Sequence, residues 1–129
     1  MRQKESREMY LETILKLEKE HGAVRSVDVA DELGYSKPSV SRAMGVLKQA
    51  GYVSHSPYEN IELTEKGRKR AKSVLRAHHL LTDFLVQVLH IDPEVAEEDA
   101  CRIEHVISDV TLDAMEEYLE TVPETVPGR

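Results

Sequence analysis

Cys101, Glu104 and His105 carry side chains that bind metal ions, and their spacing brings them close together. Positions i, i+3 and i+4 share one face of an α-helix, so a thiolate, a carboxylate and an imidazole would lie about one turn apart. This mixed set of sulfur, oxygen and nitrogen donors suits divalent first-row transition metals better than magnesium or calcium. The same pattern is compatible with a buried cysteine beside two polar surface residues, and alone it leaves both interpretations open.

The elements that position these residues begin with a second motif, two helices joined by a tight turn. Ser26 is expected to cap a short helix that ends at Leu33, and Gly34 supplies a turn residue that adopts positive φ without strain. Ser36 is expected to cap the second helix, with a proline in its first turn. This spacing is that of a helix-turn-helix, although an ordinary αα-hairpin shares it. The start of the second helix is polar and basic, as in a helix that reads a DNA groove. The residues predicted to contact DNA are Ser36, Lys37, Pro38, Ser39, Ser41 and Arg42.

Two short strands are predicted after this helix, over residues 52–56 and 60–63, with a turn at Pro57-Tyr58-Glu59-Asn60. A hairpin directly after a recognition helix is the wing of a winged helix-turn-helix. The sequence therefore predicts an N-terminal DNA-binding domain over residues 1–72.

The rest of the chain, residues 73–129, is predicted to be a helical domain. A long helix, capped by Thr64, is expected to run to about Leu89 with His78 on its apolar face. Two shorter helices are expected after Pro93 and after Ser108. The last one carries an apolar stripe, too large to remain exposed, that predicts dimerisation: Leu112, Met115 and Leu119. The predicted fold class is mainly α, with a small β-hairpin wing.

Charge is divided unevenly along the 129 residues, whose net charge is -7. Residues 1–76 carry 15 Lys and Arg against 11 Asp and Glu, whereas residues 77–129 carry 2 against 13. The first part is suited to phosphate and the second to cations or a partner. No apolar run is long enough for a membrane span, no secretory signal is visible, and one cysteine excludes an internal disulfide. These features predict a cytoplasmic protein.

Residues 8–14 (EMYLETI) and 100–109 (ACRIEHVISD) resemble the diphtheria-toxin-repressor family of metal-dependent regulators. The resemblance extends over nearly the whole chain to about residue 120. It implies a metal-activated homodimer that binds a double-stranded DNA operator and represses metal-uptake genes, and it implies no enzymatic activity. Longer members carry a C-terminal SH3-like domain, and this chain resembles a short form without it.

The resemblance also implies the metal ligands. An activating site would use Met9, Cys101, Glu104 and His105. A second site in the iron-responsive branch uses a histidine that matches His78, but the family's glutamate and histidine fall on Thr82 and Glu97 here.

The manganese-responsive branch has a carboxylate that matches Glu12, so Glu12, His78 and Glu104 could hold a second ion, with Glu104 bridging the two. That branch has carboxylates where Met9 and Cys101 stand. Two sulfur donors in their place favour Fe(II) over Mn(II), which is hard and lowest in the affinity order, while Co(II), Ni(II) or Zn(II) would also fit.

Two other functions are compatible with parts of the sequence. A small metallohydrolase could use Cys101, Glu104 and His105, but no separate general base or oxyanion-stabilising group is visible. A winged-helix regulator could instead sense a small organic ligand, with Cys101 buried. DNA binding that is insensitive to added metal would favour the second alternative.

Overall fold

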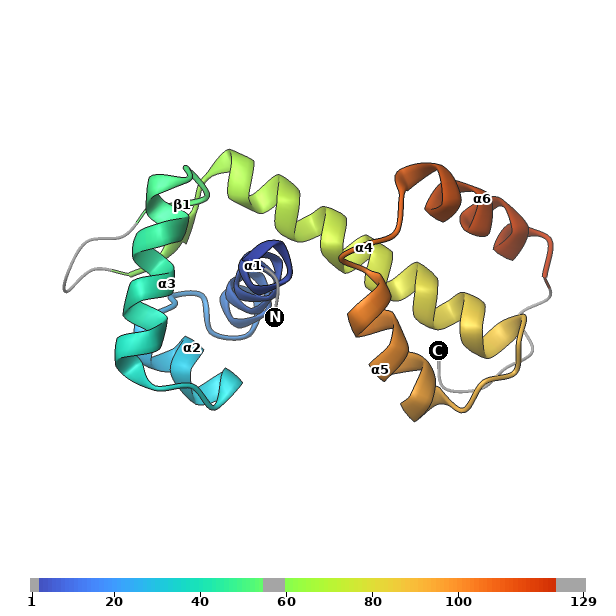
Figure 1. The fold of residues 1–129 in the computed structure, drawn as a ribbon, viewed down its shortest axis with the longest axis horizontal. Coiled ribbons are helices and arrows are strands. Elements are labelled where there is room, and N and C mark those ends of the chain that lie inside the picture. The colour runs from blue at the N-terminus through green and yellow to red at the C-terminus, as the bar shows by residue number, and fades with distance from the viewer. Residues whose placement is uncertain (1–2, 55–59, 123–129) are drawn as a thin grey trace. The chain divides into compact units, whose positions relative to one another are not determined.

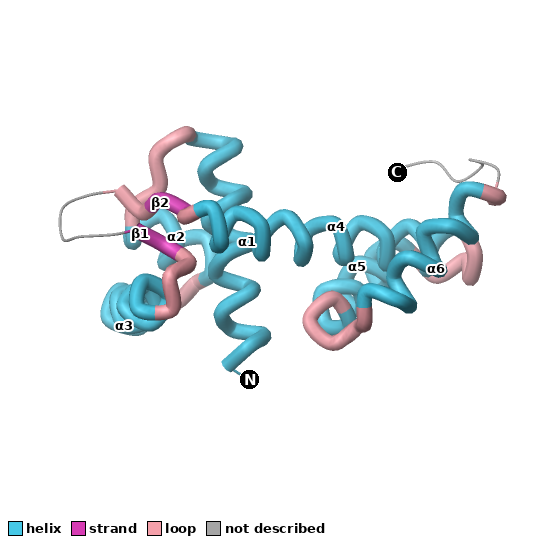
Figure 2. The backbone as a smooth tube through the Cα atoms, turned by 90° about the horizontal axis from the view of Figure 1, so that it is seen from above, coloured by secondary structure: helices cyan, strands magenta, loops and turns pink. Residues whose placement is uncertain are grey.

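The computed structural model describes residues 3–54 and 60–122, with side chains from Arg7 onward. Six helices and a two-stranded antiparallel sheet are present in this part of the chain (Figures 1 and 2), which confirms the predicted mainly α fold. The chain divides into two compact units, residues 1–73 and 74–129. The elements are α1 (Gln3–His21), α2 (Ser26–Leu33), α3 (Lys37–Gln49), β1 (Val53–Ser54), β2 (Glu62–Leu63), α4 (Glu65–Gln87), α5 (Pro93–Ile103) and α6 (Asp109–Glu120).

The first unit is built on the apolar face of α1. Tyr10, Ile14 and Leu17 are all buried, as their helical spacing predicts. Apolar residues of α2, α3 and the hairpin complete this core, because each element buries one face and leaves the other in solvent. The buried side chains include Leu11, Leu15, Val24, Val29, Val40, Met44, Leu47, Val53, Ile61 and Leu63.

The turn between α2 and α3 has the predicted helix-turn-helix form. Gly34 adopts φ 70°, and its N–H donates to the carbonyl of Ala30 at 2.9 Å. Ser36 caps α3, since its side chain accepts a hydrogen bond from the Ser39 N–H at 3.3 Å. Ser26, however, does not cap α2. It is the first helical residue, and the N–H of the extended Arg25 before it donates to the Asp28 carboxylate at 2.9 Å.

The hairpin after α3 is shorter than the sequence predicts. Val53 pairs with Leu63 and Ser54 with Glu62, and the predicted turn falls largely on residues 55–59, which lie outside the described residues. Thr64 caps α4 as expected. Its hydroxyl accepts from the Gly67 N–H at 3.1 Å and donates to the carbonyl of Gly51 at 2.6 Å, which ties the start of α4 to the end of α3.

Two ion pairs within the first unit join α1 to the beginning of α4. Arg68 makes a two-pronged contact to Glu18, with N–O distances of 2.6 and 2.9 Å. Arg70 donates to the buried Glu8 at 3.1 Å. Because Arg68 hydrogen-bonds to its carboxylate, the pKa of Glu18 lies below the ordinary value.

The second unit packs the C-terminal part of α4 against α5 and α6. Its core consists of Ala77, Leu81, Ala100 and Leu112, against which Met115 and other partly buried apolar side chains pack. Arg76 of α4 contacts Asp113 and Glu116 of α6, each at 3.0 Å. α4 ends at Gln87, two residues before the predicted end. None of the described helices is long and apolar enough to cross a membrane.

Part of the apolar stripe of the last helix belongs to this core. Leu112 is buried within the single chain, and Met115 and Leu119 are partly covered. Leu112 therefore gives no support to dimerisation through this stripe, because its side chain already packs in the core of the second unit, while dimerisation itself stays a prediction. Among the described residues of this unit, the exposed large apolar ones are Leu89, Val95, Val106, Val110 and Tyr118.

Candidate metal centre and DNA-binding surface

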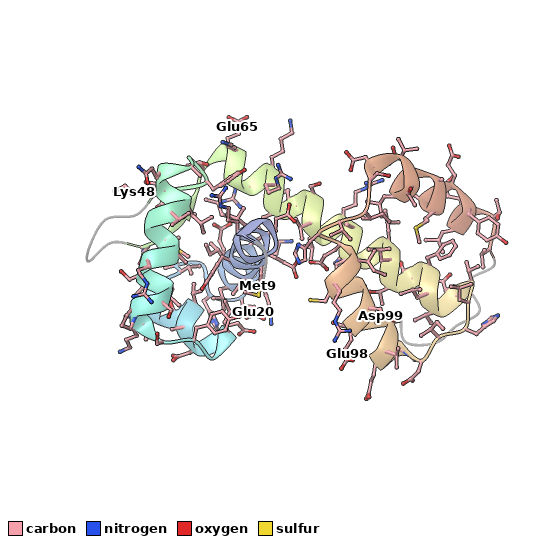
Figure 3. The ribbon with its side chains drawn as sticks, in the orientation of Figure 1. Met9, Glu20, Lys48, Glu65, Glu98 and Asp99 are labelled. Carbon is pink, nitrogen blue, oxygen red and sulfur yellow. The ribbon has the colours of Figure 1, made fainter. Side chains whose placement is uncertain are left out.

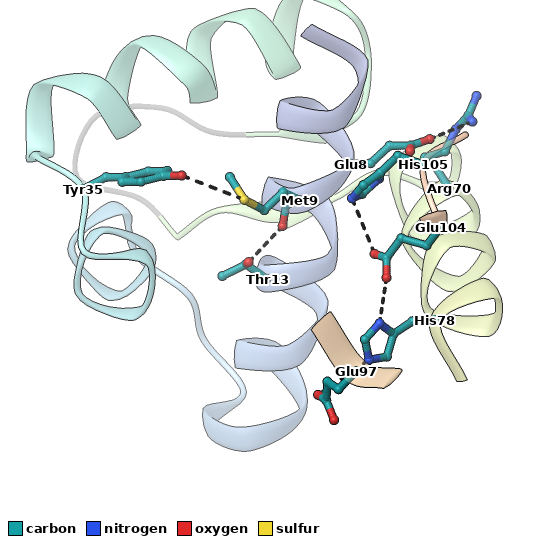
Figure 4. Close-up of polar contacts among 9 residues, drawn as sticks. All are labelled: Glu8, Met9, Thr13, Tyr35, Arg70, His78, Glu97, Glu104 and His105. Atoms are coloured by element: carbon teal, nitrogen blue, oxygen red, sulfur yellow. Dashed lines mark hydrogen bonds and ion pairs between the residues drawn. The ribbon is translucent and has the colours of Figure 1, made fainter. Parts of the chain in front are cut away.

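In the second unit, the buried carboxylate of Glu104 lies between His78 and His105 (Figure 4). Glu104 follows directly after α5, and only 1% of its side chain is exposed. One oxygen lies 2.7 Å from Nδ1 of His78, which projects from α4, and the other lies 3.6 Å from Nε2 of His105. The fold thus brings together three of the predicted ligands, and they present carboxylate and imidazole donors.

His78 has carboxylates on both sides of its ring. Its Nδ1 faces Glu104, and its Nε2 lies 3.6 Å from an oxygen of Glu97. A neutral imidazole carries one N–H, so one of its two nitrogens would turn a lone pair toward an anionic oxygen. A positive charge, from a second proton or a metal ion, removes this repulsion. The arrangement therefore fits a cation, and its donors are those that first-row divalent metals prefer.

Cys101 lies in the last turn of α5, and its side chain is exposed. Exposure does not support the alternative in which this cysteine is a buried core residue. The helix ends at Ile103, but the N–H of Glu104 still donates to the carbonyl of Ala100 at 2.9 Å, so the helical turn continues into Glu104. Glu104 is the C-terminal cap, with φ −55° and ψ −24°, and both it and His105 are buried.

Met9 and Glu12 belong to the first unit, where they lie one turn apart on α1. The thioether sulfur of Met9 accepts a hydrogen bond from the Tyr35 hydroxyl at 3.9 Å, and its carbonyl accepts one from Thr13 at 2.8 Å. In the second unit, Thr82 donates its hydroxyl to the backbone carbonyl of His78 at 2.8 Å. Among the described residues, no group of three or more His, Cys, Asp or Glu is already arranged around a metal position.

The predicted DNA-contacting residues form the exposed beginning of α3. Lys37, Pro38, Ser41 and Arg42 are exposed, and Ser36 is held by its capping role. The Ser39 hydroxyl accepts hydrogen bonds from Ser36 at 2.9 Å and from Arg42 at 3.5 Å, so these side chains are linked before any contact with DNA. Figure 3 shows side chains extending from α3 into solvent.

Two residues near the site were not among the predicted ones. Tyr35 contacts Met9 from the turn between α2 and α3, and Glu97 lies beside His78. Neither is visible from local sequence patterns, because each contact joins residues that are 19 to 26 positions apart in the sequence. For Glu97, the sequence contains one indication of a place near the site: it falls at the position of a family ligand.

The fold and these side chains define a class of protein: a winged helix-turn-helix regulator with a second, helical unit that carries a buried carboxylate between two imidazoles. Residues 4–61 match the iron dependent repressor N-terminal DNA binding domain, and residues 64–128 match the iron dependent repressor metal binding and dimerisation domain. The chain therefore belongs to the iron dependent repressor family, a family of transcriptional regulators and not of enzymes.

Relatives of different length share this likeness. An uncharacterised HTH-type transcriptional regulator of Methanocaldococcus jannaschii is 35% identical over 123 residues, covering 95% of this chain and 98% of that protein. The diphtheria toxin repressor of Corynebacterium glutamicum is 36% identical over 89% of this chain, which spans 50% of its length. The solved structure of the manganese regulator SloR has a TM-score of 0.78 at 28% identity, over 94% of this chain and 56% of that one.

Proposed function

We propose that this protein is a metal-activated transcriptional repressor that binds a double-stranded DNA operator as a homodimer. The observation that carries the proposal is the buried Glu104 carboxylate between His78 and His105. A carboxylate in a protein interior needs hydrogen-bond donors and positive charge around it; His78 contacts it at 2.7 Å, and a bound cation would add the positive charge. Membership of the iron dependent repressor family supports the same function.

The activating site would use Met9, Cys101, Glu104 and His105, and a second site would use Glu12 and His78 with Glu104 shared between them. A bound divalent ion supplies a concentrated positive charge with several open coordination positions. The protein's part is to present deprotonated donors. Buried Glu104 is held in place by His78, while the exposed Cys101 thiol can lose its proton to solvent.

The exposed start of α3 would enter the major groove. Lys37 and Arg42 supply positive charge, and small Ser41 and Pro38 allow close approach to the base edges. Proposed ligands come from both units, Met9 and Glu12 from α1 and the others from the second unit. Metal binding would therefore favour the DNA-binding arrangement, and DNA would in turn tighten metal binding by the same factor.

The deciding experiment is DNA selection with and without metal. Chelated protein is incubated anaerobically with a random duplex library, and the selection is repeated with Fe(II), Mn(II) or Co(II). We expect an enriched sequence only with metal. The Arg42→Ala variant should weaken binding by about 1–3 kcal/mol if Arg42 contacts a base, whereas a phosphate contact would flatten the salt dependence by about one unit. Lys19→Ala, which removes an exposed charge from α1, is the control.

The physiological metal is proposed to be Fe(II), because Met9 and Cys101 contribute sulfur donors. Mn(II) prefers hard oxygen ligands, so a thioether and a thiol in place of carboxylates weaken its binding relative to Fe(II). Met9→Asp combined with Cys101→Glu should move activation toward Mn(II). Wild-type protein that responds to Mn(II) at a lower buffered concentration than to Fe(II), or a double variant with no shift, would refute this assignment.

Dimerisation would use exposed apolar residues of the second unit. Val110 is 80% exposed and Val106 57% exposed, although both side chains are apolar. Val110→Asp should shift a dimer toward monomer in sedimentation experiments at micromolar concentration, while Glu117→Asp, a surface change on the same helix, should not. A wild-type chain that stays monomeric with metal and selected DNA present would contradict the proposal.

A further inference from the structure

We infer that Tyr35 is a positioning residue that holds the Met9 thioether when no metal is bound, and that metal and Tyr35 compete for this sulfur. The inference rests on the proposed role of Met9 as a ligand. It adds Tyr35, which lies outside the predicted ligand set. Tyr35 also connects Met9, within the first unit, to the start of the DNA-reading helix α3.

The contact joins side chains of α1 and of the turn between α2 and α3. The Tyr35 hydroxyl donates to Met9 Sδ at 3.9 Å, and Figure 4 shows the sulfur directed toward the tyrosine. Thr13 donates to the Met9 carbonyl at 2.8 Å. The ring of the buried Tyr10 packs edge-on against that of Tyr35, with centroids 6.2 Å apart. The edge-on contact orients the half-exposed Tyr35 ring, so its hydroxyl reaches the sulfur of the flexible methionine.

Tyr35 also sits where the position of α3 is determined. Its N–H donates to the carbonyl of Ala30 at 3.1 Å, directly after the left-handed Gly34. The next residue, Ser36, caps α3. A movement of the Tyr35 side chain therefore acts on the residue directly before Ser36, the cap of α3. No long chain of contacts is needed to connect Met9 with the start of the recognition helix.

Competition follows from the chemistry of the sulfur atom. A thioether is a neutral, weak hydrogen-bond acceptor, and it binds a metal with the same kind of lone pair. Once that sulfur donates electrons to a cation, it carries less negative charge and becomes a poorer acceptor for the Tyr35 hydroxyl. Metal capture thus weakens the contact, and by linkage the contact weakens metal binding to the same extent.

The Met9 methyl group offers a direct test in metal-free protein. The chain has four methionines, so ¹³C-methyl labelling gives four signals, and Met9→Leu identifies the signal of Met9. Tyr35→Phe removes the hydroxyl and keeps the ring. We expect it to shift the Met9 signal in the metal-free protein. Tyr10→Phe is the matched control, because it removes the hydroxyl of the neighbouring ring and should leave the Met9 signal near its wild-type position.

Titration with Co(II) tests the competition itself. Tyr35→Phe should bind Co(II) about 2- to 5-fold more tightly than wild type, the effect of removing one modest hydrogen bond. Its metal-free affinity for the selected duplex should rise by a similar factor, whereas its metal-loaded affinity should stay unchanged. In the Met9→Leu background, Tyr35→Phe should have no effect on either affinity.

Three results would overturn the inference: an unchanged Met9 methyl signal in metal-free Tyr35→Phe, an unchanged or weaker Co(II) affinity, or an equal gain in the Met9→Leu background. Failure of the proposed function looks different. If Met9 is not a ligand, Met9→Leu binds Co(II) as wild type does, and the methyl shift caused by Tyr35→Phe remains.

Discussion

Replacement of Gly67 by alanine should destabilise the protein although it places a better helix former inside α4. A Cβ at this position would overlap the carbonyl oxygen of Tyr52 and lie 2.9 Å from its carbonyl carbon. The three nearest atoms all belong to the Tyr52 backbone, so α4 or the start of the wing must move by about 1 Å or more to reach an ordinary contact. That carbonyl also accepts the Thr64 N–H at 3.0 Å, and the Gly67 N–H is part of the Thr64 cap.

The magnitude follows from the bonds at risk. Two hydrogen bonds worth about 1 kcal/mol each, together with the steric cost, outweigh the roughly 1 kcal/mol that alanine gains over glycine in a helix. Gly67→Ala should therefore lower the free energy of unfolding by about 1–3 kcal/mol, measured by urea unfolding followed by circular dichroism.

Gly45 provides the matched control for this substitution. It lies inside α3, and nothing is within 4 Å of a Cβ built there. Gly45→Ala should raise the free energy of unfolding by about 0.5–1 kcal/mol, because only the helix propensity changes. If Gly67→Ala proves as stable as wild type, the close approach of α4 to the Tyr52 carbonyl is not present in solution.

Three further substitutions test other parts of the fold. Glu18→Gln should cost about 0.5–1 kcal/mol at neutral pH. Because Arg68 lowers the pKa of Glu18, this contribution is present above the ordinary glutamate pKa of about 4.3 and is lost as the pH falls through the folded-state pKa. The free energies of unfolding of wild type and variant, measured in urea, should therefore become equal below about pH 4. Ser36→Ala should cost about 1 kcal/mol through the lost cap, and Ser36→Asn should restore it in thermal unfolding. Leu112→Ala should lower the free energy of unfolding by about 2–5 kcal/mol in chemical unfolding, because the side chain is buried in the core of the second unit. A loss below about 1 kcal/mol would mean that Leu112 is not buried in solution.

Local chemistry made most of the fold predictable. Ser36, Thr64 and Ser108 were expected to start helices, and each one caps a helix in the structure. Such caps depend on residues three positions apart, which a sequence displays directly. The prediction failed at Ser26 for the same local reason, since the carboxylate of Asp28 made Arg25 the better place to begin α2.

The candidate site was less predictable, because its geometry depends on tertiary contacts. The i, i+3, i+4 spacing predicted that Cys101, Glu104 and His105 act together, and this grouping stays a prediction. Spacing alone did not predict their burial: Glu104 and His105 are buried, whereas Cys101 is exposed. No pattern within α5 could reveal that His78, 26 residues earlier, hydrogen-bonds to Glu104.

Glu97 stands where the resemblance places a histidine ligand, and this difference changes the charge around His78 in the second unit. Where the family's iron-responsive branch has a histidine, this chain places a carboxylate 3.6 Å from His78, whose other nitrogen already faces Glu104. Two carboxylates around one imidazole favour a cation more strongly than one does, since each added anion lowers the energy of a nearby positive charge. Glu97 is largely exposed and Glu104 is buried, so water screens the first interaction and not the second. The departure from the family pattern therefore alters the peripheral donor and leaves the buried Glu104, with its two histidines, as the centre of the proposed metal site.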